Sequence, residues 1–195
     1  MRERAVPMVT VPAFLAALRS GALAEGPRAE LLGGRVVPGH TPSPTQMAVL
    51  AHVHAGIASK EFREAGGIAV VNPAFRLGPG DLLRADLSLL RAPDAFAGAR
   101  GASVATAGVG GSFDPQAAVV IIELARGRST REVRVPLYAA AGARELWLLD
   151  VIRGWTEVLR SPWRGAYRSR TLWYPGEALR LQEFDGLEVV AMPAP

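Results

Sequence analysis

The sequence predicts a single α/β domain built on a mixed β-sheet. Short apolar runs rich in β-branched residues alternate with segments of helical spacing, an order typical of a sheet flanked by helices. With 195 residues, 49% of them hydrophobic and 21% charged, the chain can bury one sizeable core. We therefore expect residues 1–195 to form one domain, in which residues 1–8 are a flexible N-terminal tail.

The N-terminal third is predicted to contain two helices separated by a hairpin. Thr10 can cap a first helix that ends at Gly21. Residues 29–38 read as two short strands around a Gly-Gly pair, which is a hairpin signal. A longer helix is expected over residues 44–65, because its apolar residues recur every four positions. This stripe consists of Val49, Val53 and Ile57.

The rest of the chain is predicted to supply most of the sheet. Apolar runs mark the expected strands 68–72, 75–77, 82–90, 117–124 and 145–151. Residues 92–116 are rich in Gly, Ala, Ser and Pro without a period, so we expect a long surface loop. Ser129 and Thr130 can cap a helix over residues 130–141, which Gly142 ends. Beyond Asp150, aromatic and turn residues alternate, which predicts a C-terminal antiparallel meander. We expect its aromatic side chains to pack inside it, and the alternative is a base-stacking platform.

Composition limits the function classes. The formal net charge of +4 and the pI of about 10.3 permit nucleic-acid binding, although a GC-rich genome also accounts for basic residues that are all arginine except Lys60. The chain has no cysteine, which excludes disulfides and thiolate metal sites. No apolar stretch reaches the roughly 18 residues of a membrane span, and the N-terminus lacks a signal-peptide core, so we expect a cytoplasmic protein without a membrane partner.

Two carboxylates lie where strands are expected. Glu123 follows the apolar run 117–122, and Asp86 lies inside the run 82–90. A buried carboxylate is costly unless it is paired or binds a metal. Two carboxylates on neighbouring strands could form a divalent-metal site. The alternatives are an ion pair of Glu123 with Arg126 or Arg128, and a pair or turn hydrogen bond for Asp86.

Four segments, in order, resemble the motifs of one protein family. They are the block Ala-Glu-Leu-Leu-Gly-Gly-Arg-Val-Val at 29–37, Arg-Ala-Asp-Leu-Ser-Leu-Leu at 84–90, Val-Val-Ile-Ile-Glu-Leu at 119–124, and residues 133–150 with their Tyr, Gly-Ala-Arg-Glu-Leu-Trp and final Asp. Together they resemble the Uma-type family of bacterial predicted restriction endonucleases, within the PD-(D/E)XK nuclease superfamily. The likeness covers roughly residues 9 to 190.

The resemblance implies a restriction-endonuclease-like fold and a metal-dependent endonuclease that hydrolyses DNA. In this family the strand Asp and the strand Glu bind Mg²⁺, with Mn²⁺ as an alternative, and Asp86 and Glu123 occupy these positions. Glu30 occupies the position of an additional N-terminal acid. Arg134 stands at the lysine position, where it would face the phosphate. Hard Mg²⁺ prefers carboxylate oxygens, in agreement with this assignment.

The sequence also departs from the family pattern. The superfamily places a lysine two residues after the Glu, but Ala125 is found here, and Arg134 cannot deprotonate to act as a general base. The alternative is therefore a catalytically degenerate protein that acts as a DNA-binding or protein-interaction module, and a homodimer is possible in either case. Arg126, Arg128 and Arg131 form a basic cluster with Arg134 that could follow a DNA backbone or line a solvated helix start.

Overall fold

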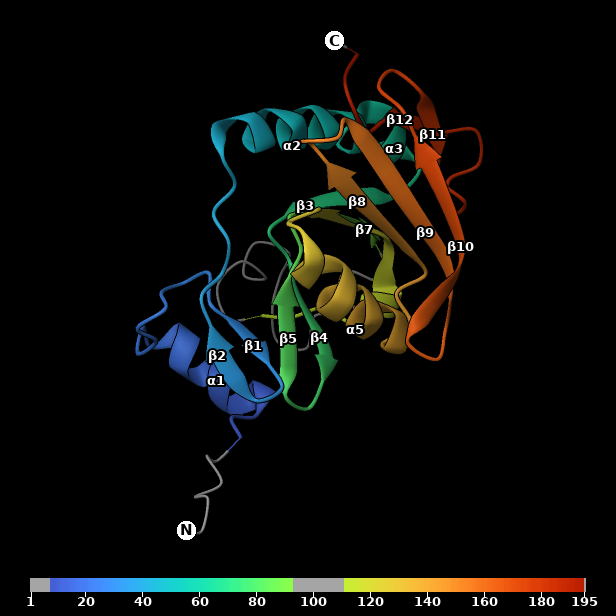
Figure 1. Cartoon of the computed structure of the whole chain (residues 1–195). Coiled ribbons are helices and arrows are strands. Elements are labelled where there is room, and N and C mark those ends of the chain that lie inside the picture. Colours follow the sequence, from blue (N-terminus) through green and yellow to red (C-terminus); the bar gives the residue numbers. More distant parts are fainter. Residues whose placement is uncertain (1–7, 93–110, 195) are drawn as a thin grey trace, which may run out of the picture.

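A six-stranded mixed sheet carries most of the core in the computed structural model, which describes residues 8–92 and 111–194 (Figure 1). Its strands, in spatial order, are β10 (Ala166–Trp173), β9 (Trp155–Trp163), β8 (Glu145–Asp150), β7 (Ala118–Leu124), β6 (Leu87–Arg91) and β3 (Gly67–Val71). β7 and β8 pair in parallel, whereas the other neighbouring strands pair antiparallel. The predicted α/β class and mixed sheet are confirmed.

A second sheet packs beside the N-terminal helix. It consists of β2 (Arg35–Val37), β1 (Glu30–Leu32), β5 (Asp81–Arg84) and β4 (Ala74–Gly78) in that order, all paired antiparallel. Helix α1 (Val11–Arg19) begins at Thr10, whose side chain accepts a hydrogen bond from the backbone of Ala13. Its buried Phe14 packs with Leu31 and Leu82 of this sheet, so the predicted helix and hairpin are both present.

The two faces of the six-stranded sheet are covered differently. One face packs against helices α2 (Pro44–Ile57) and α3 (Lys60–Glu64) and against the C-terminal hairpin of β11 (Ala178–Arg180) and β12 (Glu188–Val190), all in one cluster around Trp147. The sequence predicted a single helix over 44–65, but the helix is divided because Ser59 adopts an extended conformation. No helix of the described residues is long and apolar enough to cross a membrane.

The other face packs against a helix that begins irregularly. The predicted helix 130–141 consists of a π-helical turn, η2 (Thr130–Arg134), followed by α5 (Val135–Ala140). Pro136 has no N–H and cannot make the regular α-helical bond to the carbonyl of Glu132, which favours a wider turn before it. Tyr138 of α5 is fully buried against this face. The irregular turn therefore lies directly beside the end of β7.

The chain passes between the two sheets at a sharp corner. The sequence predicted one strand over 82–90, but β5 and β6 belong to different sheets, with Ala85 and Asp86 between them. Backbone bonds fix this corner: Asp86 donates to Ile122 O (3.1 Å) and accepts from Asn72 N (3.0 Å). Two sheets with different strand directions cannot share one straight strand, and the break directs the side chain of Asp86 toward the end of β7.

Part of the predicted surface loop belongs to the core. Residues 93–110 lie outside the described residues, as do residues 1–7 of the predicted N-terminal tail. Phe113, however, is buried, and it forms a β-bridge and a ring contact with Phe75. A short 3₁₀ turn, η1 (Pro115–Ala117), then leads into β7. The predicted C-terminal meander is present as the β9–β10 and β11–β12 hairpins.

The packing predicts that an Ile→Ala substitution changes stability much more at position 122 than at position 152. Ile122→Ala removes a fully buried side chain from the centre of β7 and should lower the free energy of unfolding by about 2–5 kcal/mol, because it leaves a cavity. Ile152→Ala alters a turn residue that is 93% exposed and should leave stability nearly unchanged. Urea denaturation of both variants measures this difference, and equal midpoints would contradict the position of β7 in the core.

Candidate active site

Glu123 is a fully buried carboxylate at the end of β7. Strand alternation directs Ile122 toward the Trp147 cluster and Glu123 toward α5. Its Oε1 accepts hydrogen bonds from Nη2 of Arg134 and from the hydroxyl of Tyr138, both at 2.6 Å. Its Oε2 has no hydrogen-bond partner among the described residues, and Nη2 of Arg126 lies 3.7 Å away. One oxygen of this buried carboxylate is thus left for another ligand.

Asp86 converges on the same place from the corner between the sheets. Its Oδ2 accepts the backbone N–H of Leu124 at 2.8 Å and Nη2 of Arg126 at 2.5 Å. Because this Nη2 also lies near Glu123, the two carboxylate oxygens are no farther apart than the sum of the two distances, about 6.2 Å. The structure therefore brings Asp86 and Glu123 together, as the sequence predicted.

Arg134 joins the remaining acid to this pair. Its Nη1 donates to Oε2 of Glu30 at 2.7 Å, and its Nη2 donates to Glu123 and to the carbonyl of Arg84, both at 2.6 Å. Glu30 is buried on β1, and its Oε1 accepts the backbone N–H of Arg84 at 2.8 Å. The sequence predicted a phosphate-facing Arg134, but here the guanidinium is directed into the protein, where two buried carboxylates require a counter-charge.

Burial shifts the ionisation of these groups. Burial, assisted by the charge of Asp86, raises the pKa of Glu123, while Arg134 and Arg126 oppose the shift. Burial and the charge of Glu123 hold the pKa of Tyr138 well above its usual range, so its hydroxyl remains a hydrogen-bond donor. Burial acts to lower the pKa of Arg134, but Glu123, Tyr138 and Glu30 together raise it well above its ordinary value. Arg134 is therefore a permanent cation and not a proton acceptor.

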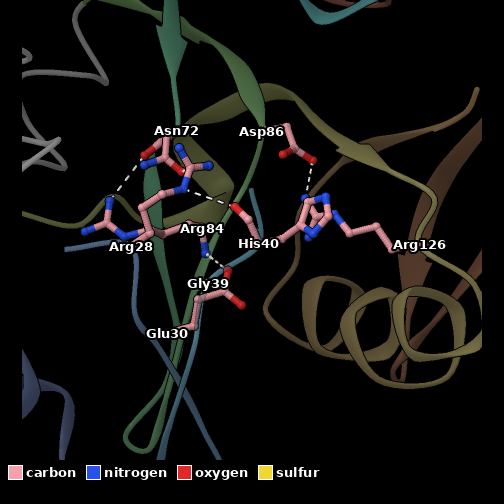
Figure 2. Close-up of a pocket in the computed structure, with 8 residues that line it drawn as sticks. All are labelled: Arg28, Glu30, Gly39, His40, Asn72, Arg84, Asp86 and Arg126. Carbon is pink, nitrogen blue, oxygen red and sulfur yellow. Dashed lines mark hydrogen bonds and ion pairs between the residues drawn. The ribbon is translucent and has the colours of Figure 1, made fainter. Parts of the chain in front are cut away.

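A small polar pocket opens beside Asp86 and Glu30 (Figure 2). Figure 2 shows Arg126 reaching Asp86, and the carboxylate of Glu30 beside the backbone of Arg84. The full lining is Arg28, Glu30, Gly39, His40, Asn72, Arg84, Asp86 and Arg126. The sequence did not identify five of these as site residues: Arg28, Gly39, His40, Asn72 and Arg84. Of these, Asn72 carried a signal, since the dipeptide Asn72-Pro73 favours a turn.

The predicted basic cluster is divided in the structure. Arg126 belongs to the site, where its backbone N–H also donates to Oγ1 of Thr130 at 3.0 Å. Arg128 is exposed to 92% and lies 3.7 Å from Glu132, whereas Arg131 forms an ion pair with the buried Glu157. These three arginines therefore have separate surroundings and do not form one continuous surface with Arg134.

The carboxylates of Asp86 and Glu123 suit a divalent cation, provided that the Arg126 side chain moves away. Within residues 8–92 and 111–194, no group of three or more His, Cys, Asp or Glu side chains is arranged to hold a metal ion. Asp86 and Glu123 nevertheless supply hard carboxylate oxygens no more than about 6.2 Å apart, and the unpartnered Oε2 of Glu123 is the kind of buried acceptor that a cation satisfies. Because Arg126 lies against both carboxylates, it must leave before a metal binds there.

Comparison with known proteins assigns the chain to a family. Residues 12–193 match the family model described as "Uma2: Putative restriction endonuclease". The chain belongs to the Uma2 family. This confirms the resemblance in the sequence motifs. A similar fold is found in the crystal structure of "a putative nuclease belonging to DUF820" from Anabaena variabilis, with a TM-score of 0.67, 14% identity, and coverage of 94% of this chain and 95% of that chain. No curated protein matches this Uma2-family chain.

The buried ion pairs predict a strong dependence of stability on Arg134. Arg134→Met leaves Glu30 and Glu123 without their shared counter-charge and should destabilise the fold by about 3–5 kcal/mol. Arg128→Met removes the same charge from an exposed position and serves as the matched control, with no change expected. Urea denaturation in EDTA separates the two. A similar stability for both variants would show that Arg134 does not neutralise the buried acids.

Proposed function

We propose that this Uma2-family protein is a Mg²⁺-dependent endonuclease that hydrolyses DNA phosphodiester bonds, with Asp86 and Glu123 as the metal ligands. The observation that carries the proposal is the approach of these two carboxylates to within about 6.2 Å, with one buried oxygen of Glu123 unpartnered. Mg²⁺ prefers such oxygen ligands, and Mn²⁺ can replace it. Family membership and the nuclease-like fold support the same reaction class.

The surrounding residues position the two ligands. The backbone N–H of Leu124 fixes the carboxylate of Asp86, while Tyr138 and Arg134 fix the orientation of Glu123. When bound, the metal supplies Lewis-acid activation of water and charge stabilisation at the phosphate. Glu30 and Arg134 are positioning residues in this proposal, because Arg134 neutralises Glu30 and holds Glu123 at the same time.

Arg126 acts as an internal competitor for the metal. Its Nη2 contacts both proposed ligands, so its positive charge occupies the position where a cation would bind. Arg126 lies on the loop after β7, next to Gly127, whose φ of +82° gives the loop a turn that other residues rarely adopt. Once displaced, the guanidinium is available to bind a phosphate oxygen.

A second candidate function rests on the same contacts. Arg126 and Arg134 together neutralise the carboxylates without a metal, which is what a degenerate family member requires. Such a protein would retain the nuclease fold as a DNA-binding module without cleavage. Metal affinity distinguishes this candidate from the endonuclease, because a module of this kind has no need to bind Mg²⁺.

Metal binding should respond in opposite directions to two substitutions. In calorimetry with Mn²⁺ or Mg²⁺, Glu123→Gln should abolish binding, and Arg126→Ala should tighten it at least several-fold by removing the competing charge. Glu64→Gln, an exposed acid on α3, is the control and should bind as wild type. Because burial raises the pKa of Glu123, affinity should begin to fall at a higher pH than for an ordinary carboxylate. If neither wild type nor Arg126→Ala binds metal, the degenerate candidate is favoured.

Cleavage gives the direct test of the activity. Wild-type protein with Mg²⁺ should nick or linearise plasmid DNA, and EDTA should stop the reaction. Asp86→Asn should lower the rate by a factor of about a hundred or more, as expected for a group that stabilises the transition state electrostatically. Asp114→Asn, an exposed acid before η1, should cleave normally. Metal binding without any cleavage by wild type or Arg126→Ala would overturn the endonuclease assignment.

A further inference from the structure

An exposed tryptophan and two arginines lie together at the tip of the β9–β10 hairpin. Trp163 is 52% exposed, and Arg164 and Arg168 are both exposed. The guanidinium carbon of Arg168 lies 4.4 Å from the centroid of a Trp163 ring, and that of Arg164 lies 5.4 Å away. The sequence predicted that the C-terminal aromatic residues would pack inside the meander, and Trp163 departs from that prediction.

The side chains of both arginines are exposed to solvent. In the described part of the chain, no carboxylate forms an ion pair with Arg164 or Arg168. The neighbouring Arg170, in contrast, shares the buried Glu157 with Arg131. An arginine that stacks on an indole ring still presents its in-plane N–H groups, which match two oxygens of a phosphate. The hairpin tip therefore presents two exposed guanidinium groups, each close to the Trp163 ring, to an anionic partner.

The backbone of the hairpin tip is already ordered before any partner binds. Trp163 pairs with Ala166 across a two-residue loop, and both loop residues have positive φ, +48° at Arg164 and +77° at Gly165. Positive φ at both positions is the signature of the tight type I′ hairpin turn. The hydroxyl of Tyr167 donates to the carbonyl of Ala143 at 2.9 Å and ties the hairpin to the chain that follows α5. A partner therefore meets a surface that needs little ordering.

Strand geometry gives the separation between this tip and the candidate active site. Register places Glu123, Leu148 and Glu157 opposite one another on β7, β8 and β9, so Glu157 lies roughly 10 Å from Glu123. Leu172 of β10 lies opposite Glu157, and Arg168 lies four residues farther along β10. At about 4.8 Å per strand and 3.3 Å per residue, Arg168 is therefore roughly 20 Å from Glu123. A duplex covers that distance in about six base pairs.

We propose that the tip of the β9–β10 hairpin binds the phosphate backbone of DNA outside the cleavage site. Arg164 and Arg168 contact phosphates, and Trp163 is a positioning residue whose ring lies against both guanidinium groups. The choice of DNA as the polymer rests on the proposed function. The exposed positive charges of the tip are complementary to any such backbone.

Binding of a fluorescein-labelled 20-base-pair duplex, followed by anisotropy in EDTA with the full chain, tests the proposal. The double variant R164A/R168A should weaken binding at low salt about tenfold or more and lower the slope of log affinity against log salt by up to about two. The matched control R153A/R180A removes two exposed arginines elsewhere, each paired with a carboxylate, and should bind nearly as wild type. Trp163→Phe should retain binding, whereas Trp163→Leu should lose part of it.

Four results would overturn the proposal: no binding by wild type, unchanged binding by R164A/R168A, an equal loss in R153A/R180A, or equal binding by the two Trp163 variants. The plasmid assay separates this proposal from the proposed function. If wild type does not cleave plasmid DNA with Mg²⁺ while R164A/R168A loses DNA binding, the endonuclease assignment fails and the hairpin inference stands. If wild type cleaves in a Mg²⁺-dependent manner while R164A/R168A binds DNA normally, the reverse holds.

Discussion

The bridge formed by Arg134 is the interaction on which the arrangement of the site depends. Its guanidinium connects Glu30 of one sheet with Glu123 of the other and also binds the carbonyl of Arg84 near the corner between the sheets. Each carboxylate alone would be an uncompensated buried charge, and Arg134 alone would be a buried cation. The three groups are therefore tolerable only together. This requirement couples the relative position of the two sheets to the orientation of Glu123.

The irregular start of the helix makes this bridge possible. The π-helical turn η2 ends at Arg134, and α5 continues with Tyr138 one turn later, so both donors meet the same oxygen of Glu123. Because both donors bind Oε1, the other oxygen, Oε2, has Arg126 near it, and this is the oxygen that the proposed metal would bind. Two donors thus hold one oxygen of the carboxylate, while the other has no hydrogen-bond partner among the described residues. The charge that occupies this position in the structure comes from the chain itself.

Much of this could be predicted from the sequence because it depends on local patterns. Apolar runs located β7 and β8, and the position of Glu123 after such a run identified it as a costly carboxylate. The predictions that were wrong concern features set by contacts between residues far apart in the sequence. The run 82–90 has no local feature that divides it, because its break at Asp86 is set by hydrogen bonds to Asn72 and Ile122 from distant segments. The inward direction of Arg134 depends on Glu30, which is 104 residues away.

In the proposed function, the space between Asp86 and Glu123 is a metal site that Arg126 fills in the absence of metal. The most direct measurement is a crystal structure of the full chain soaked in Mn²⁺, with anomalous data collected to locate the ion. The account predicts an anomalous peak about 2.2 Å from oxygens of both Asp86 and Glu123, slightly longer than for Mg²⁺, with the Arg126 side chain displaced from the carboxylates. No peak at this position, with Arg126 still bound to Asp86 in a crystal saturated with Mn²⁺, would contradict it.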